Sequence, residues 1–215
     1  YGFVPNPVFI WTTGNNGLLG STLALLFIAM GLGGWWLDRE AWQKQGWILR
    51  QAGRSPTDFV DQAGMGPTLL NMSLTGVLGT AYVLAVGSDL NGPTLGAIFT
   101  IVGFSAFGKH PRNIVPIMLG VFIASMLKDW SADDPSAVLA ALFGTTLAPI
   151  AGRFGWRWGI VAGFVHSSVA QTVGQLHGGL VLYNNGFAAG LVAAILVPVI
   201  LALQPVAKTD PGAPR

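Results

Sequence analysis

The sequence predicts an all-α protein, a polytopic integral membrane bundle of about seven hydrophobic segments. Two observations carry this prediction. First, 52% of the residues are hydrophobic and only 9% are charged, whereas an ordinary soluble domain is about one quarter charged. Second, the apolar residues gather in long runs, and a helix needs about 20 of them to cross a bilayer. Eight Trp and thirty Gly agree with membrane interfaces and closely packed membrane helices.

The apolar runs divide the chain into predicted spans within one membrane domain, residues 1–215. The runs are Gly17–Leu37, Pro67–Gly87, Pro93–Phe107, Ile114–Leu127, Ser136–Ala151, Trp158–Gln175 and Asn184–Leu203. Two of them, Pro93–Phe107 and Ser136–Ala151, are shorter than a full crossing. Each is therefore either a short span or a re-entrant half-helix buried in protein.

Basic residues alternate between the loops that join these runs. Some loops are rich in Lys or Arg, such as those around Arg39 and Arg153. They alternate with loops that contain no Lys or Arg, and with the loop around Lys128, in which acidic residues outnumber the single Lys. Cytoplasmic loops of membrane proteins carry the excess of Lys and Arg. The pattern therefore predicts about seven crossings of the cell (inner) membrane, with the first residues of this chain outside and the C-terminus in the cytoplasm.

The polar stretch 38–66 is predicted to lie on the cytoplasmic side. Its first part, Asp38–Gly53, mixes Trp with basic side chains. That mixture fits a short helix lying in the membrane interface and equally a plain basic loop. Its second part, Arg54–Gly66, is a polar linker in which Ser55-Pro56 indicates the start of a helix.

An Asn-Gly pair opens three of the apolar runs, and this suggests an internal repeat. The pairs are Asn16-Gly17, Asn91-Gly92 and Asn185-Gly186, all on the predicted outer side. The second and third pairs fit an internal duplication in which Pro67–Phe107 and Trp158–Leu203 are two copies with the same orientation in the membrane. Repeats of this kind are common in transporters. The simpler interpretation is that each Asn caps a helix and each Gly permits the turn before it.

The run Trp158–Gln175 carries more polar residues than a membrane span usually does. They are His166, Ser167, Ser168, Gln171 and Thr172. Polar groups cost free energy in hydrocarbon unless partners or water satisfy them. His166 is predicted near the bilayer midplane. It indicates either a solute or proton site or an interhelical hydrogen bond, which is typically worth about 0.6–2 kcal/mol.

Uncharged amide side chains lie next to this run and in the second span. Asn184 and Asn185 follow the outer loop that contains His177, and Asn71 lies within Pro67–Gly87. Amides both donate and accept hydrogen bonds without charge, which fits a neutral or zwitterionic solute better than a strongly charged one. The candidate substrate-binding residues are therefore His166, Ser167, Gln171, His177, Asn184, Asn185, Asn91 and Asn71.

The basic motif Gly108–Asn113, GKHPRN, lies at the predicted cytoplasmic end of a short span. One interpretation is an inner gate or a patch that binds anionic ligands. The favoured interpretation is that its positive charges hold the cytoplasmic end of the span against lipid headgroups. Chemical motifs are otherwise absent. The chain has no Cys, no P-loop, no H-E-x-x-H and no G-x-S-x-G, and no predicted span has an Asp or Glu in its apolar core. We therefore expect no enzymatic activity, no catalytic residue, no metal and no cofactor.

The stretches Asn91–Val121, NGPTLGAIFTIVGFSAFGKHPRNIVPIMLGV, and Gly174–Pro198, GQLHGGLVLYNNGFAAGLVAAILVP, carry a family resemblance. The chain resembles an uncharacterised prokaryotic family of multi-pass membrane proteins, the domain of unknown function 1576, from about Asp58 to Leu203. The resemblance implies an integral membrane protein, and it implies that this chain is the C-terminal half of a longer one. It implies no substrate.

The sequence therefore predicts a membrane transporter or channel for a small uncharged or zwitterionic polar solute. The alternatives are a structural or accessory membrane subunit, and a membrane enzyme that uses His166 or His177 as an acid–base group. The expected partners are the lipid bilayer, the solute, a missing N-terminal half of the same protein and, as an open alternative, further copies of the chain. A net charge of +2 gives no reason to expect nucleic acid. The polar, Pro-rich residues 205–215 predict a disordered tail.

Overall fold

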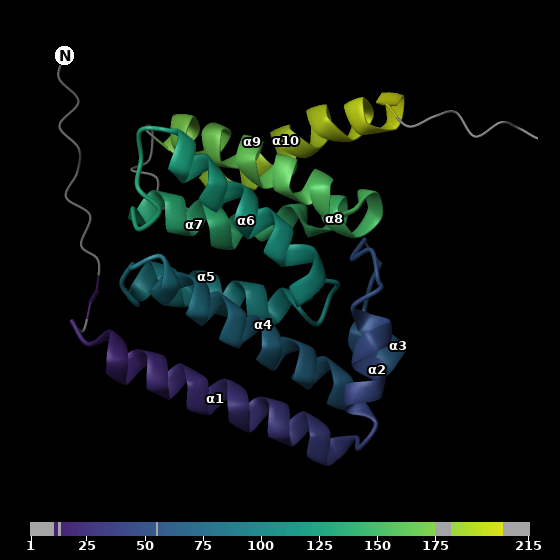
Figure 1. Ribbon diagram of the computed structural model, residues 1–215. Helices are drawn as coiled ribbons and strands as arrows, with labels where there is room; N and C mark the ends of the chain where they lie inside the picture. Colours follow the sequence, from purple (N-terminus) through teal and green to yellow (C-terminus); the bar gives the residue numbers. More distant parts are fainter. Residues whose placement is uncertain (1–10, 13, 55, 175–181, 204–215) are drawn as a thin grey trace, which may run out of the picture.

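The computed structural model describes residues 11–12, 14–54, 56–174 and 182–203, which are almost entirely helical (Figure 1). The elements are α1 Asn16–Leu37, α2 Ala41–Ile48, α3 Phe59–Ala63, α4 Met65–Ala85, α5 Gly92–Phe104, α6 Pro111–Leu127, α7 Pro135–Gly144, the 3-10 turn η1 Thr145–Leu147, α8 Ala148–Phe154, α9 Trp156–Gly174 and α10 Leu182–Leu203. An isolated bridge joins Thr12 and Asn91, and the described residues form no strand. The predicted all-α class is confirmed.

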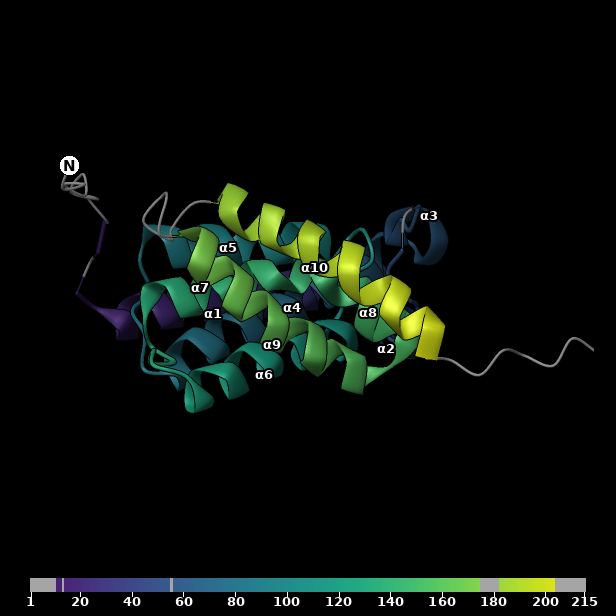
Figure 2. The same ribbon diagram turned by 90° about the horizontal axis from the view of Figure 1, so that it is seen from above.

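The long helices run back and forth between two ends of the molecule (Figure 1). α1, α5, the pair α7–α8 and α10 run from the left-hand end of that view to the right-hand end, and α4, α6 and α9 run back. Seen from above, α9 and α10 lie side by side over the rest of the bundle (Figure 2). Each predicted span corresponds to one of these helices, except that Ser136–Ala151 corresponds to α7, η1 and α8 together.

Length and composition make this bundle a membrane protein. Helical stretches long and apolar enough to cross a membrane are Asn16–Leu37, Met65–Ala85, Pro135–Phe154 and Asn184–Leu203. α5 and α6 are shorter apolar helices of 13 and 17 residues. Large apolar side chains cover the outside of α1 and α10, while many polar side chains are buried. An apolar outside around a partly polar inside is the arrangement that a bilayer requires.

Small residues let α1 and α4 approach closely. A Cβ on Gly34 would lie 2.6 Å from the backbone oxygen of Gly66, and a Cβ on Gly76 would meet the Phe27 ring at about the same distance. Ser73 on α4 also donates a 2.7 Å hydrogen bond to the Phe27 backbone oxygen. Backbone contact and a hydroxyl bond therefore join the two helices, as small and polar residues do between membrane helices.

Two short helices cover the right-hand end of the bundle. α2 lies within the stretch Asp38–Gly53, for which the sequence predicts either a helix or a loop. α3 lies within Arg54–Gly66, for which the sequence predicts a linker. The predicted start at Ser55-Pro56 is wrong, because α3 begins at Phe59. Asp58 caps it by accepting hydrogen bonds from two backbone N–H groups, which is the usual role of an N-cap carboxylate.

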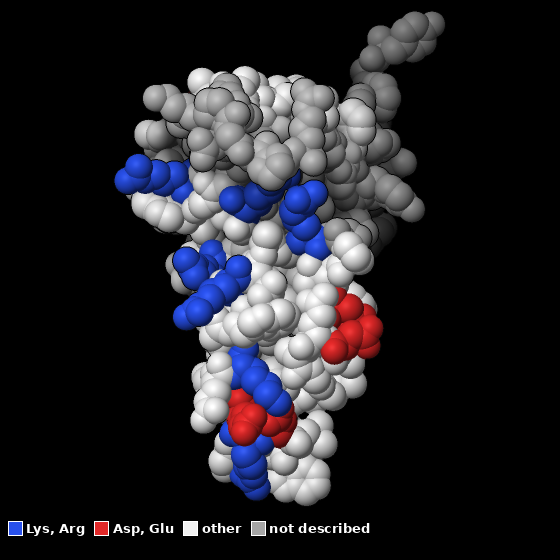
Figure 3. Space-filling model, turned by 90° about the vertical axis from the view of Figure 1, so that its right-hand side faces the viewer, with Lys and Arg blue, Asp and Glu red and all other residues white. Residues whose placement is uncertain are grey.

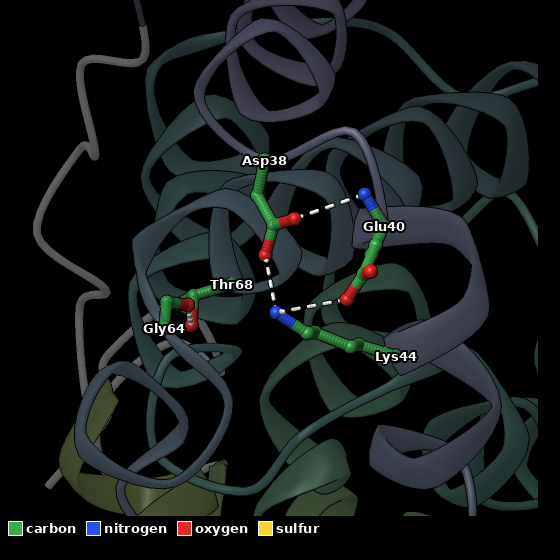
Figure 4. Close-up of polar contacts among 5 residues, drawn as sticks. All are labelled: Asp38, Glu40, Lys44, Gly64 and Thr68. Carbon is green, nitrogen blue, oxygen red and sulfur yellow. Dashed lines mark hydrogen bonds and ion pairs between the residues drawn. The ribbon is translucent and has the colours of Figure 1, made fainter.

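The joint between α1, α2 and α4 is polar and lies at the surface (Figure 4). Asp38, just after α1, accepts a 2.7 Å hydrogen bond from the Lys44 ammonium and a 2.9 Å bond from the Glu40 backbone N–H. The hydrogen bond from Lys44 lowers the pKa of Asp38 and raises that of Lys44. Nearby, Thr68 donates to the Gly64 backbone oxygen inside the first turn of α4. These contacts fix the turn that leads out of the first long helix.

Charge is distributed unevenly between the two ends. Figure 3 faces the right-hand end of Figure 1 and shows Lys and Arg side chains gathered there. The basic residues at this end are Arg39, Lys44, Arg50, Arg54, Arg112, Arg153 and Arg157, and the acidic residues Asp38, Glu40, Asp58 and Asp61 lie there as well. Among the described residues, Lys128 is the only basic side chain at the opposite end, and Asp89, Asp129, Asp133 and Asp134 accompany it there. We call the right-hand end the basic end.

The stretch Pro135–Phe154 crosses the bundle as a broken helix. α7 ends at Gly144, the chain makes one 3-10 turn, and α8 begins at Ala148 with Pro149 in its first turn. Proline has no N–H and disrupts an α-helix that would continue through it, which explains the break. The residues at the break, Gly144 and Thr145, are completely or almost completely buried near the middle of this stretch.

Candidate functional site

Close backbone contact with α6 determines which way α9 faces. A Cβ on Gly163 of α9 would lie 2.0 Å from the Ile117 backbone oxygen, and a Cβ on Gly120 of α6 would lie 2.1 Å from that of Ile160. One face of α9 therefore rests directly on the α6 backbone. The remaining faces are free to contact α7 and α10, which also pack against α9.

His166 lies near the middle of α9 and is completely buried. Its ring lies beside the Asn185 side chain of α10 and the Ala140 backbone of α7. It also covers Gly144, because a Cβ there would lie 2.7 Å from the His166 ring carbon Cδ2. Neither ring nitrogen has a partner that meets the geometry of a hydrogen bond. The imidazole is thus held mainly by packing, with the Asn185 side chain and the Ala140 backbone close to it but outside hydrogen-bond geometry.

Other buried polar atoms near this position also lack partners. They are Ser167 Oγ, Gln171 Nε2, Asn184 Nδ2 and Asn185 Oδ1. An unsatisfied buried polar group costs about 1–3 kcal/mol, and such groups are few in native proteins. We name the residues His166, Ser167, Gln171, Asn184 and Asn185 the α9–α10 polar cluster. These five predicted residues belong to two adjacent helices, and the structure brings His166 of α9 next to Asn185 of α10.

A second polar group surrounds the turn between α5 and α6. The Asn71 amide of α4 donates 2.8 Å hydrogen bonds to the backbone oxygens of Ser105 and Lys109, and its oxygen accepts from Gln45 of α2. The Ser105 hydroxyl bonds to Thr75 at 2.8 Å. We name Gln45, Asn71, Thr75, Ser105 and Lys109 the turn cluster. Both N–H groups of Asn71 are used within the protein, so Asn71 holds this turn in place.

Lys109, in this turn, points into the bundle. Its side chain is 8% exposed, its ammonium donates a 2.8 Å hydrogen bond to the Thr145 hydroxyl, and it lies 5.1 Å from the Phe104 ring centre. Thr145 in turn donates to the Leu142 backbone oxygen at 2.6 Å, so its oxygen is free to accept from Lys109. Burial lowers the pKa of Lys109 to about 7.

The favoured interpretation of the Gly108–Asn113 motif is therefore wrong for most of its residues. A clamp on lipid headgroups needs exposed cations, but Lys109 and His110 are both buried and only Arg112 is exposed. His110 bonds through Nε2 to the Gln51 backbone oxygen at 2.9 Å, which makes Nε2 the protonated nitrogen. Burial lowers the pKa of His110, the Gln51 bond opposes that effect, and the Arg112 charge adds to it.

The two polar clusters meet the broken helix at consecutive residues. His166 covers Gly144, and Lys109 bonds to Thr145. The segment that follows α2 packs against the α5–α6 turn at the basic end. A Cβ on Gly53 of this segment would lie 2.5 Å from the Gly108 backbone oxygen of the turn. Gly53 has a φ of +71°, a conformation that other residues adopt only with strain. Sequence reasoning singled out the motif that contains Lys109 but not the burial of its side chain, and it missed Thr145. The available signal was a lysine directly after a helix too short to cross.

The three Asn-Gly pairs have different roles. Asn91 caps α5 and forms a capping box with Thr94, and Asn15, next to the first pair, caps α1. Asn185, however, lies inside α10, one turn after its start. Asn91 therefore does not join His166 and Asn185, and the capping interpretation does not apply to the third pair. His177 lies outside the described residues.

Two observations limit the chemistry of the bundle. In the described part of the chain, no three His, Asp or Glu side chains come together as a metal site would require. Four cavities of the bundle have no residue of the α9–α10 polar cluster in their linings. One of about 490 Å³ opens at the basic end, between the start of α6 and the start of α9. Its lining includes Arg50, Gln51, His110, Arg112, Gly152 and Trp156.

Fold and site together define a polytopic α-helical membrane protein with buried polar clusters beside a broken helix. The family model described as "Protein of unknown function (DUF1576)" matches residues 37–202, and the chain belongs to this family. The match begins at the end of α1 and runs almost to the end of α10, so it includes both polar clusters. Comparisons with curated proteins and with solved structures give no match.

Proposed function

We propose that this protein is a transporter or channel for a small uncharged or zwitterionic polar solute. The observation that supports it best is the α9–α10 polar cluster, where His166 and Asn185 lie together with unused hydrogen-bonding groups in the middle of an apolar bundle. Ionisable residues within membrane helices are rare and mark substrate, ion or proton pathways, and His166 is such a residue. Interrupted helices also line many transport sites, and α7–α8 is interrupted beside His166.

The proposed site recognises its solute through neutral groups. Imidazole, hydroxyl and amide side chains can donate and accept hydrogen bonds in exchange for those that a polar solute makes with water. Small residues surround them, since Ala140, Ala141, Ala170 and Ala188 pack together at this level of the bundle. In this proposal the basic end faces the cytoplasm of a cell with an inner membrane, in keeping with the positive-inside rule.

The test is solute flux into liposomes that contain the purified protein. A panel of neutral and zwitterionic solutes is presented to wild type, to His166→Ala and to Asn185→Ala. We expect flux of at least one solute above empty liposomes, and a drop of about tenfold or more in each variant, which corresponds to about 1.4 kcal/mol. Thr80→Val is the matched control, because Thr80 is a buried hydroxyl that bonds only within its own helix, to Gly76. No flux across the whole panel would contradict the proposal.

The second candidate is an accessory membrane subunit without a transported solute. It is favoured by an apolar groove of about 290 Å³ between α4 and α6, lined by Leu78, Tyr82, Val86, Val115, Met118 and Phe122. Such a groove fits a hydrophobic helix of a partner. Filling it with Ala85→Trp would then remove a stoichiometric partner from the purified protein. A larger residue at Gly76 would not test partner binding, because it would meet the Phe27 ring of the same chain.

The third candidate, an enzyme, gains no support from the described residues. His166 has neither an Asp nor a Glu beside it, so a carboxylate–imidazole pair for acid–base chemistry is missing at this position. The other proposed acid–base group, His177, lies outside the described residues.

A further inference from the structure

Lys109 is a buried cation without a counter-charge. Within the described part of the chain, the ion pairs are those of Lys44 with Asp38 and Glu40, and Lys109 takes part in none. An ammonium has three N–H donors, and only Thr145 is bonded to one of them. Removing such a charge from water costs several kcal/mol unless an anion or further hydrogen bonds offset the cost. The position therefore favours an anionic partner.

A cavity of suitable size lies beside the ammonium. It has a volume of about 160 Å³ and is lined by Gly53, Phe104, Phe107, Lys109, Thr145, Thr146, Ala148 and Pro149. This volume is below the range of about 300–1,000 Å³ that is usual for drug-sized ligands, so it fits a small group. The lining combines one cation and one available hydroxyl donor, that of Thr146, with apolar and aromatic walls, since the Thr145 hydroxyl already donates to Leu142. Cation and hydroxyl donors of this kind bind the oxygens of a carboxylate or a phosphate.

Further basic residues lie along the approach to this cavity. A second cavity, of about 290 Å³, shares Thr146 and Pro149 with the first and has Arg54 and Arg153 in its lining. Both arginines are exposed at the basic end. Positive charge around a cleft raises the local concentration of anions and their rate of entry. An anion would thus meet Arg54 and Arg153 first and Lys109 last.

We propose that the cavity beside Lys109 binds a small oxyanion, a carboxylate or phosphate group, that enters from the basic end. The Lys109 ammonium neutralises the anion with its two remaining N–H donors, and the Thr146 hydroxyl donates a further hydrogen bond to it, while Thr145 holds the ammonium in place. The anion is either a free solute or the headgroup of an anionic lipid, since both present the same oxygens. The proposal does not depend on transport through the α9–α10 polar cluster.

The test is ligand-dependent thermal stability of the full chain at pH 6.5, where Lys109 is protonated. The chain is placed in nanodiscs of neutral phosphatidylcholine, and inorganic phosphate or acetate replaces chloride at constant ionic strength. We expect a saturable rise in Tm of about 3 °C or more for wild type. In a second arm, phosphatidylglycerol replaces part of the neutral lipid. A rise in the second arm alone identifies a lipid headgroup as the anion.

Two variants assign the effect to this cavity. Lys109→Gln keeps a donor for Thr145 but removes the charge, and we expect it to lose the rise in both arms. Thr146→Leu blocks the part shared by the two cavities without touching Lys109, so it keeps the experiment decisive if Lys109→Gln does not fold. Arg112→Gln, in the separate 490 Å³ cavity, is the control and should retain the rise. The proposal is overturned if wild type shows no rise in either arm, or if Lys109→Gln and Thr146→Leu both retain it.

Discussion

The α9–α10 polar cluster and the turn cluster use the same residue types near the same break in the α7–α8 stretch, but their hydrogen bonding differs. In the turn cluster, the Asn71 amide joins α2, α4 and the α5–α6 turn through three bonds. In the α9–α10 polar cluster, Asn185 and both nitrogens of His166 retain groups without partners. A buried amide that is satisfied by its own protein stabilises the fold, whereas one that is not satisfied costs stability and is available to a ligand. Gln45 Oε1 in the turn cluster also lacks a partner, so the contrast holds for the two asparagines: Asn71 acts as a structural clamp, and Asn185 is a candidate binding residue.

Replacing the two asparagines by leucine tests this comparison most strongly. Asn71→Leu leaves two backbone oxygens and the Gln45 amide without their partner, so we expect the free energy of unfolding to fall by about 3 kcal/mol or more. Asn185→Leu removes an unsatisfied group, and we expect a change of less than about 1 kcal/mol in either direction. Unfolding in mixed micelles with increasing sodium dodecyl sulfate, followed by circular dichroism, measures both. Equal losses in the two variants would mean that Asn185 is also structural.

The charge in the turn cluster should make stability depend on pH. Burial lowers the pKa of Lys109 from 10.5 to about 7, so between these values the unfolded chain binds more protons than the folded one. Stability therefore rises with pH in this window, on the order of 2 kcal/mol from pH 7 to pH 9. Arg54 and Arg153, which line the adjoining cavity, and His110, the next residue in the chain, remain in Lys109→Met. That variant should lose the rise, which the same unfolding measurement at both pH values checks in an anion-poor buffer.

Gly144 offers a way to disturb the α9–α10 polar cluster alone. In Gly144→Ala, the new methyl group would lie 2.7 Å from the His166 ring, so the ring must move. We expect a loss of about 1–2 kcal/mol in stability and, if the cluster carries solute, a loss of flux similar to that of His166→Ala. Gly96→Ala is the control, because nothing lies within 4 Å of a Cβ at Gly96. Unchanged flux in Gly144→Ala would show that the position of the imidazole does not matter for transport.

The helices of this protein are easier to predict from its sequence than the contacts between them. Each long apolar run is helical, although Ser136–Ala151 is divided into α7, η1 and α8, because the requirement for apolar length acts locally along the chain. Asn71 and Asn185 cannot be told apart by sequence, since both are amides in apolar runs and only their tertiary partners differ. The sequence pattern places Lys109 at the surface because the run Pro93–Phe107 extends to the predicted membrane boundary. In the structure α5 ends at Phe104, and the turn that follows carries Lys109 back into the bundle.

The position of His166 along its helix can be predicted from the local sequence pattern, but its neighbours in the fold cannot. Its place near the middle of α9 follows from counting residues along an apolar run. For its neighbour Asn185 the sequence predicts a helix start, like that at Asn91, because an Asn-Gly pair is typical of one. α10 instead begins at Leu182, so the same pair falls inside the helix, where Asn185 faces α9 and Gly186 is exposed. Gly144, which makes room for the imidazole, carries no signal that distinguishes it from the other glycines of the chain.

The smallest expected effect belongs to the exposed joint between α1 and α2. Asp38 accepts a hydrogen bond from Lys44 as short as those of the buried clusters, but the Lys44 side chain is 42% exposed (Figure 4). Water and salt screen exposed ion pairs, so most contribute little to stability. We therefore expect Asp38→Asn to leave the Tm unchanged within error above pH 5, where the Asp38 carboxylate, with its lowered pKa, is ionised in the wild type. Differential scanning fluorimetry of Asp38→Asn beside Asn71→Leu measures the contrast. A fall in Tm as large as that of Asn71→Leu would show that short polar contacts stabilise this bundle regardless of burial. Hydrogen-bond satisfaction of buried groups would then no longer explain the difference between its two buried clusters.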